Sequence, residues 1–394
     1  MSLTTSSVRT KTLPVAVIDS YTRDILLAGL GTSHGEMAEA FLGNEIETVR
    51  FDTNKYDVRD LENSWQQFTL TLRELLESVK DGLKVSALNL SSGFSVPIDF
   101  LGQVFGMKLN RFNLGENRES IREKLFDLPS QRKRVEEKVK KPYFKRKIAS
   151  QRNVKAALIK EELKEFLKVL SRSKMLIEMI ELIEGLKKLG IEIFISAGNN
   201  GPNMVNLLGL AKDVYLVGSG NSRKAEPYSC DNDLVNAHEL GTFWLAKKRI
   251  NESEYTLRIN HEGCKEIPCN SSNIDTLLQK ETCGFRPSGV TARDDLAYRH
   301  YTHRFLPISK LKRTLQRAIK EKLLDITSYE ADLLKKLPEE AEYFILDFYG
   351  SRTLFFDAQD GLITESTKFT YPLYGTSYAT PLFLRNHLMQ SDLS

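Results

Sequence analysis

The sequence predicts an α/β fold in three layers: a mainly parallel β-sheet with helices on both faces, carrying helical insertions. Two observations predict it. Short apolar runs, several of them rich in Val and Ile, recur along the chain and have the length of buried parallel strands. Between them lie stretches whose large apolar residues are three and four positions apart, the period of an amphipathic helix. Alternating strands and helices build a parallel sheet because each helix carries the chain back across one face.

The first part of the chain supplies three of the expected strands and two of the expected helices. We expect strands at residues 14–18, 47–51 and 85–90. A glycine-rich loop leads into a short helix at residues 36–42, and apolar periodicity predicts a longer helix at residues 61–79. Small polar residues follow the first and third strands. Sites in open α/β sheets gather at such carboxyl ends.

The middle of the chain continues the alternation. A helix is expected at residues 174–189, and Gly190 stands where a glycine commonly ends a helix. A strand at residues 191–196 follows and ends in the loop Ala-Gly-Asn-Asn-Gly at residues 197–201. Another strand is expected at residues 213–217.

Two stretches interrupt this alternation, and we expect both to be insertions within a single domain of residues 13–394. Residues 95–172 are mostly helical in pattern and carry a basic block at residues 131–147. Residues 239–342 are mixed in pattern and include a charged helical tract. Both insertions are candidates for substrate selection or regulation.

The basic block contains nine Lys or Arg and two Glu. Charge runs of this kind are usually solvated helix faces or loops. Aromatic residues at 143 and 144 among the charges also suit a surface that binds an acidic membrane or an acidic protein. We expect no nucleic-acid partner, since no base-reading module is present.

Composition limits the remaining classes. The 394 residues are 41% hydrophobic, enough for a large core, and the net charge is only +4. No secretory signal and no apolar run of membrane-spanning length stand out. We therefore expect a cytoplasmic protein, or one exported without an ordinary signal peptide, for example into a host cell. The four cysteines lack a paired zinc spacing and are expected to be mostly reduced, with one disulfide within residues 264–283 left open.

Four polar residues stand where strands end or helices begin: Asp19, His34, Asn199 and Ser377. Each has an ordinary structural role, as a turn residue or a helix cap. Together they have the groups needed for acyl transfer. A serine becomes a nucleophile when a histidine takes its proton, a buried aspartate orients that histidine, and an amide can donate to the oxyanion that forms.

The segments around these residues resemble those of the subtilisin-like serine proteases, or subtilases. Residues 375–381 match Gly-Thr-Ser-x-Ala-x-Pro at every fixed position. Residues 197–201 match Ala-Gly-Asn-x-Gly, and residues 17–20 match Val-Ile-Asp-Ser before a Tyr replaces the family's Gly. At residues 34–39 the family's His-Gly-Thr-x-Val-Ala becomes His-Gly-Glu-Met-Ala-Glu. The order Asp, His, Ser is also that of the family.

The resemblance implies a subtilisin-like fold and a serine endopeptidase that acts through an acyl-enzyme. It makes Ser377 the nucleophile, His34 the general base, Asp19 its orienting partner and Asn199 an oxyanion donor. A protein or peptide substrate would be bound by Ser91, Ser92, Gly93, Ala197 and Gly198. Alternatives are a catalytically inactive binding protein on the same fold, and a peptide cyclase or transpeptidase. No cofactor is expected. Calcium is common in the family, but the sequence shows no convincing ligand set.

Two positions near the expected site raise further questions. Glu36 stands two residues from His34, and a carboxylate close to the imidazole would raise the histidine pKa and disfavour the basic form. If Glu36 points to solvent, it has little effect. At the other segment, we expect Gly375 to permit a sharp turn, Ser377 to begin a helix, and Pro381 to lie in its first turn.

Overall fold

The computed structural model describes most of the chain outside the second insertion. The described residues are 13–21, 32–53, 61–152, 159–221, 224–226, 229–249, 255–259, 261–269, 285–287, 346–348, 352–357, 361–365 and 370–391. The expected helical tract at residues 311–337 and Cys283 lie outside these ranges.

The main sheet confirms the predicted α/β class. In the described residues six strands run parallel in the order β2-β1-β3-β5-β7-β9, and a short β8 pairs antiparallel with β7. The strands are β1 (Val15–Asp19), β2 (Thr48–Asp52), β3 (Ala87–Leu90), β5 (Glu192–Ser196), β7 (Tyr215–Asn221), β8 (Lys224–Ala225) and β9 (Ala237–Glu239). Neighbouring β1, β3 and β5 therefore end at one edge of the sheet.

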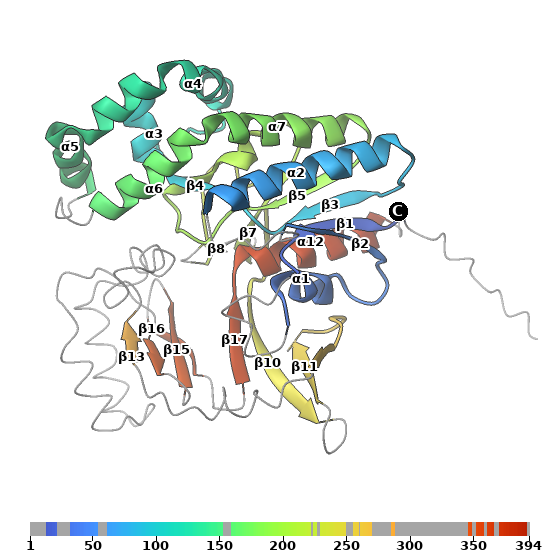
Figure 1. The fold of residues 1–394 in the computed structure, drawn as a ribbon. Helices are drawn as coiled ribbons and strands as arrows, with labels where there is room; N and C mark the ends of the chain where they lie inside the picture. Colours follow the sequence, from blue (N-terminus) through green and yellow to red (C-terminus); the bar gives the residue numbers. More distant parts are fainter. Residues whose placement is uncertain are drawn as a thin grey trace, which may run out of the picture.

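Helices cover both faces of this sheet. Figure 1 shows α2 (Leu61–Lys80) and α7 (Ser173–Lys188) on one face, and α1 (His34–Leu42) and α12 (Thr376–Ser391) on the other. Strand β1 serves both layers, because Ala16 and Ile18 join the core under α2 and α7 while Val15 and Val17 pack with α1 and α12. All four side chains are fully buried. Burying a Val or Ile side chain contributes about 2 kcal/mol, so β1 is anchored from both sides.

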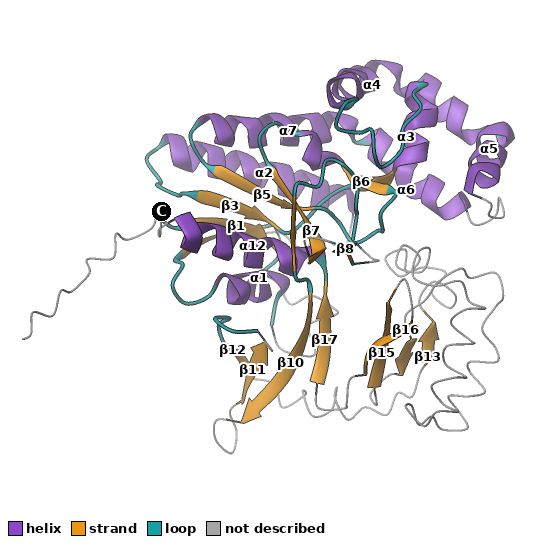
Figure 2. Ribbon diagram, turned by 180° about the vertical axis from the view of Figure 1, so that it is seen from behind, coloured by secondary structure: helices purple, strands orange, loops and turns teal. Residues whose placement is uncertain are grey.

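The first insertion is helical, as predicted. It contains α3 (Ile98–Phe105), α4 (Arg118–Lys140), α5 (Pro142–Arg152) and α6 (Ile159–Ser171). Figures 1 and 2 show these helices beyond one end of α7, continuing the layer of α2 and α7. Their buried side chains, among them Phe100, belong to the same hydrophobic cluster as the sheet residues. The insertion therefore shares the core of the sheet.

Apart from Glu239, which ends β9, the described part of the second insertion, residues 239–342, is antiparallel β-structure that pairs with strands later in the chain. Strands β10 (Thr242–Arg249), β11 (Tyr255–Ile259) and β12 (Ile267–Cys269) form a sheet that β17 (Thr370–Tyr374) joins by pairing with β10. A separate sheet contains β13 (Phe285–Pro287), β14 (Leu346–Phe348), β15 (Arg352–Asp357) and β16 (Gly361–Glu365). Strand β17 leads directly into α12. The pairing of β17 with β10 thus fixes where α12 begins.

Candidate active site

Asp19 and His34 are in direct contact. The His34 Nδ1 atom lies 2.8 Å and 2.9 Å from the two carboxylate oxygens of Asp19. Asp19 is 2% exposed at the end of β1, and its Oδ1 also accepts a hydrogen bond of 2.7 Å from the Ser20 amide. A carboxylate acceptor requires the proton on Nδ1, which leaves the lone pair of a neutral imidazole on Nε2. Nε2 is therefore the nitrogen that can act as a base.

The helix cap of α1 fixes the position of His34. Ser33 is the N-cap, and its hydroxyl accepts a hydrogen bond of 3.2 Å from the Glu36 amide. In return, the Glu36 carboxylate accepts from the Ser33 amide at 2.8 Å, the Ser33 hydroxyl at 3.0 Å and the Thr32 hydroxyl at 3.1 Å. This is a capping box. The Glu36 carboxylate is therefore held by the cap of the helix that carries His34 and does not extend freely into solvent.

Tyr21 secures the first turn of α1 to the end of β1. A Cβ atom added to Gly35 would lie only 2.8 Å from the Tyr21 ring, so the ring rests directly on the helix backbone beside His34. The Tyr21 hydroxyl donates a 2.9 Å hydrogen bond to Glu39, whose buried carboxylate is also bound by Arg50. Burial, followed by the negative charge of Glu39, raises the pKa of Tyr21 well above its usual range. The phenol is therefore a neutral donor.

Ser377 lies in the first turn of α12 and is 7% exposed. A Cβ atom on Gly375 would lie 3.0 Å from the Ser377 Oγ and 3.1 Å from the Asn199 Nδ2. The hydroxyl and the amide therefore face the same small space, which glycine leaves open. A nucleophile and a donor that both reach one position are what an acyl-transfer site requires.

Thr376 orients the amide of Asn199. The Asn199 Oδ1 accepts hydrogen bonds from the Thr376 amide at 2.7 Å and the Thr376 hydroxyl at 2.9 Å. The same hydroxyl accepts a 3.1 Å hydrogen bond from the Gly198 amide. Because Oδ1 is occupied in this way, Nδ2 is the end of the amide left toward Ser377. The role of Thr376 was missed in the sequence, although it lies within the recognised motif.

Pro381 lies in the second turn of α12, so the prediction that it lies in the first turn is wrong. In a helix its missing N–H would have bonded to the carbonyl of Ser377, four residues earlier. That carbonyl instead accepts a 3.0 Å hydrogen bond from the Ser91 hydroxyl. Ser91 in turn accepts a 2.9 Å hydrogen bond from Asn89. The proline thus frees a carbonyl that ties α12 to the end of β3.

Tyr378 brings the two helix starts together. Its ring lies 5.5 Å from the His34 ring and 5.3 Å from the Phe41 ring, between α1 and α12. The contacts of Asp19 with His34, and of Ser91 and Asn199 with the start of α12, gather the predicted residues at the carboxyl edge of β1, β3 and β5.

A pocket of about 220 Å³ opens beside Ser377. It is lined by Ser91, Gly93, Ser95, Ser196, Gly198, Asn199, Asn200 and Thr376. Of the residues expected to bind substrate, Ser91, Gly93 and Gly198 line it. Ser92 is half-buried outside the lining, and the side chain of Ala197 is fully buried in the hydrophobic core.

Asn206 supports the wall of this pocket through hydrogen bonds to the backbone. Its role was not predicted from the sequence. Asn206 is fully buried, its Nδ2 donates 2.7 Å to the Ser196 carbonyl, and its Oδ1 accepts from the Phe94 and Leu208 amides. A side chain at Gly93 would overlap the Asn206 amide. The glycine at position 93 was the only available signal, because a buried asparagine with structural partners carries no recognisable motif.

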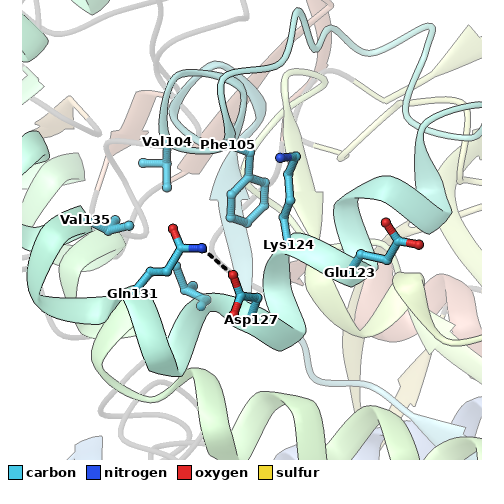
Figure 3. Close-up of a pocket in the computed structure, with 8 residues that line it drawn as sticks. Val104, Phe105, Glu123, Lys124, Asp127, Gln131 and Val135 are labelled. Carbon is cyan, nitrogen blue, oxygen red and sulfur yellow. Dashed lines mark hydrogen bonds between the residues drawn. The ribbon is translucent and has the colours of Figure 1, made fainter.

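The basic block lies on α4 and α5. Lys138 in this block donates hydrogen bonds to the Gln103 and Val104 carbonyls at 2.6 Å and 3.2 Å. Tyr143, in contrast, is 71% exposed. A second pocket, of about 300 Å³, lies between α3 and α4 in this region, and Figure 3 shows the Gln131 amide bonded to Asp127 one turn away on α4. Its lining is Val104, Phe105, Glu123, Lys124, Asp127, Leu128, Gln131 and Val135, none of which belongs to the predicted site.

Other kinds of site have little support in the described part of the chain. No three His, Cys, Asp or Glu side chains there are grouped closely enough to hold a metal ion. None of the described helices combines the length and apolar character needed to cross a membrane. The thiols of Cys230 and Cys264 are both outside disulfides.

The chain matches no protein-family model and no curated protein. Its function must therefore be inferred from the arrangement of its own residues.

Proposed function

We propose that the chain is a subtilisin-like serine endopeptidase, a hydrolase that cleaves peptide bonds through an acyl-enzyme. One observation carries the proposal. The Asp19–His34 pair, with Nδ1 2.8 Å from the carboxylate, lies at the same sheet edge as the small space faced by Ser377 Oγ and Asn199 Nδ2. This arrangement supports acyl transfer, which needs a base, a nucleophile and an oxyanion donor at one site.

In the proposed first step, the Ser377 Oγ attacks the peptide carbonyl carbon and its proton passes to the His34 Nε2. Asp19 stabilises the imidazolium that forms. The carbonyl oxygen becomes an oxyanion and is bound by the Asn199 Nδ2 and by the Ser377 amide. That amide lies in the first turn of α12, where an N–H has no helical partner and the helix dipole favours negative charge.

In the proposed second half, the C–N bond breaks and His34 gives its proton to the leaving amine. Water then attacks the acyl-enzyme while His34 takes its proton, and Ser377 is released with its hydrogen restored. The substrate backbone would add as an extended strand beside residues 91–93, as peptides do at exposed strand segments. Gly93 is exposed, so its backbone is accessible to such a strand.

The alternative of an inactive binding protein rested partly on Glu36, because a carboxylate close to His34 would disfavour the basic form of the imidazole. The capping box gives Glu36 a structural role in the helix that carries His34, which supports the peptidase over the inactive alternative. A peptide cyclase would use the same four residues and differ in whether water or an amine accepts the acyl group.

Labelling by a fluorophosphonate tests the proposal, because the reagent needs an activated serine and no knowledge of the substrate. We expect the native chain to be labelled at Ser377, and Ser377→Ala and His34→Ala to remain unlabelled. Asn199→Ala should label slowly. Thermal unfolding of each variant establishes that it is folded. A folded native chain that resists the reagent at Ser377 would rule out a working triad.

A further inference from the structure

The pocket beside Ser377 is placed to receive one substrate side chain. Its walls come from the loop after β3, through Ser91, and the loop after β5, through Asn199. Ser91 bonds the Ser377 carbonyl and Asn199 bonds Thr376, so the pocket adjoins the reacting position directly. The residue whose carbonyl approaches Ser377 therefore has its own side chain next to this pocket.

The chemistry of the lining restricts what can enter. All eight residues that line it are Ser, Gly, Asn or Thr, without a charge and without a large apolar side chain. A Lys, Arg, Asp or Glu side chain would lose hydration there and gain no opposite charge. A large apolar side chain would find few apolar atoms to pack against. The lining favours a neutral side chain that forms hydrogen bonds.

Much of the hydrogen-bonding capacity of this lining is already used internally. The Ser91 hydroxyl accepts from Asn89 and donates to the Ser377 carbonyl. The Thr376 hydroxyl accepts from the Gly198 amide and donates to the Asn199 Oδ1. These hydroxyls brace the site and cannot also serve as full partners for a substrate.

Ser95 and Asn200 differ from those braced groups. The Ser95 hydroxyl lies against Gly198, where a Cβ atom would overlap it, and its side-chain contact among the described residues is a 3.9 Å approach to the Cys230 sulfur. Asn200 is half-buried at the pocket wall, and its amide has no side-chain hydrogen bond within the described structure. A hydroxyl and a carboxamide together offer donors and acceptors.

We propose that this pocket selects a carboxamide side chain, that of Asn or Gln, at the residue on the amino side of the cleaved bond. The inference rests on the proposed peptidase function. A carboxamide carries one acceptor and two donors, which match the Ser95 hydroxyl and the Asn200 amide without any charge. Sites that hydrogen-bond a substrate group discriminate strongly against analogues that lack it, because their own polar groups are then left unpaired.

A peptide library made by digesting a cell extract tests the proposal without a known substrate. The native chain is incubated with the library, and new peptide ends are read by mass spectrometry. We expect Asn and Gln to be enriched at the residue before the cleaved bond. Matched peptides with Gln, Met, Leu, Lys or Glu at that position should then show kcat/KM for Gln at least about tenfold above the others.

Two substitutions at one position sharpen the test. Ser95→Ala should lower the ratio of kcat/KM for the Gln peptide to that for the Met peptide by about threefold to tenfold, the usual effect of one lost hydrogen bond. Ser95→Asp should move the preference toward Lys, because it adds a negative charge to the pocket. Ser130→Ala makes the same chemical change on the exposed surface of α4 and should leave the ratio unchanged.

Fluorophosphonate labelling of the same preparation separates the two proposals. If Ser377 is labelled but cleavage follows Leu or Lys at least as readily as Gln, the carboxamide proposal is overturned and the peptidase proposal stands. A labelled chain that leaves the library uncut also overturns the pocket proposal. If Ser377 is not labelled in a folded chain, the peptidase proposal fails, and the specificity inferred from it fails as well.

Discussion

The pocket beside Ser377 and the pocket between α3 and α4 differ in how their walls are built. The pocket between α3 and α4 is the larger, at about 300 Å³ against about 220 Å³, yet long side chains such as Lys124 and Gln131 form its rim. The pocket beside Ser377 is lined by short side chains, several of which are braced by hydrogen bonds to backbone or to one another. Rotamer freedom costs free energy when a ligand binds, so the smaller pocket is the better prepared for specific recognition.

Loss of the nucleophile should have the largest effect. Ser377→Ala is expected to reduce peptide cleavage on the order of 10³-fold or more, because covalent catalysis is lost. Gln131→Ala, in the larger pocket, should leave kcat/KM within about twofold, as expected of a surface substitution. Steady-state cleavage of a library-derived peptide measures both. Equal losses in the two variants would contradict the assignment of function to the smaller pocket.

Removal of the proposed oxyanion donor, Asn199, should have the second largest effect. Asn199→Ala is expected to lower kcat by about 10²- to 10³-fold with little change in KM, since the amide acts mainly on the transition state. The measurement is a full dependence of rate on peptide concentration. A rise in KM with kcat unchanged would mean that Asn199 binds the ground state instead.

Loss of the hydrogen bond from Tyr21 to Glu39, which holds α1 to the end of β1, should have a smaller effect, measured as a change in the free energy of unfolding. Tyr21→Phe is expected to lower the free energy of unfolding by about 2 kcal/mol at pH 8, because it removes a hydrogen bond to the buried Glu39 carboxylate. The raised pKa of Tyr21 sets a pH dependence. The unfolded phenol ionises near pH 10 while the folded one stays neutral, so this stabilisation is present below about pH 10 and declines above it.

Urea unfolding of the native chain and of Tyr21→Phe at pH 8 and pH 11 measures that dependence. The difference between the two proteins should shrink at the higher pH. A difference that is constant across this range would show that the Tyr21 phenol ionises normally.

The hydrogen bond from the Ser91 hydroxyl to the Ser377 carbonyl, which joins the end of β3 to α12, should contribute still less to the free energy of unfolding. Ser91→Ala leaves the Ser377 carbonyl without its hydrogen bond and is expected to cost about 1 kcal/mol of unfolding free energy. Adding Pro381→Ala restores an N–H that can reach this carbonyl within the helix. The double variant should therefore lose less than the sum of the two single variants. Strict additivity in this cycle would contradict the proposed exchange of partners.

Charge removal on the insertion should have the smallest effect on the site. Substituting Lys141, Lys145 and Arg146 by Gln is expected to change unfolding free energy by less than about 0.5 kcal/mol and peptide cleavage by less than about twofold. Binding to vesicles that contain anionic lipid should weaken, by about 1 kcal/mol for each cation that lies near the membrane. Binding that is unchanged by these substitutions and by added salt would exclude an acidic membrane partner for the basic block.

Sequence patterns predicted the strands and helices of the sheet well, because each pattern depends on local burial. The helix predicted at residues 174–189 is α7 (Ser173–Lys188), and Gly190 has the positive φ of +86° expected at a helix end. The prediction for Pro381 was wrong because α12 begins at Thr376, and even a start at Ser377 would place Pro381 just beyond the first turn of about 3.6 residues.

The contacts that place the candidate site residues were less accessible to sequence reasoning. Motifs suggested Asp19, His34, Asn199 and Ser377, and the local pattern Ser33-x-x-Glu36 could also have identified the capping box, although it was overlooked. The bracing by Ser91 and Asn206 depends on pairs far apart in the chain. Side chains that act through such partners leave no periodic signal in the sequence.

The hydrogen bond between Ser91 and Ser377 can form only late in the synthesis of the chain. The two residues are 286 positions apart, and a ribosome adds about 5–20 residues per second, so roughly 15–60 seconds separate their synthesis. During that interval the nascent chain already contains Asp19 and His34 but lacks Ser377. On the proposed mechanism, the candidate site would have no nucleophile until α12 has been made, and the growing chain and its neighbours would not be cleaved during synthesis.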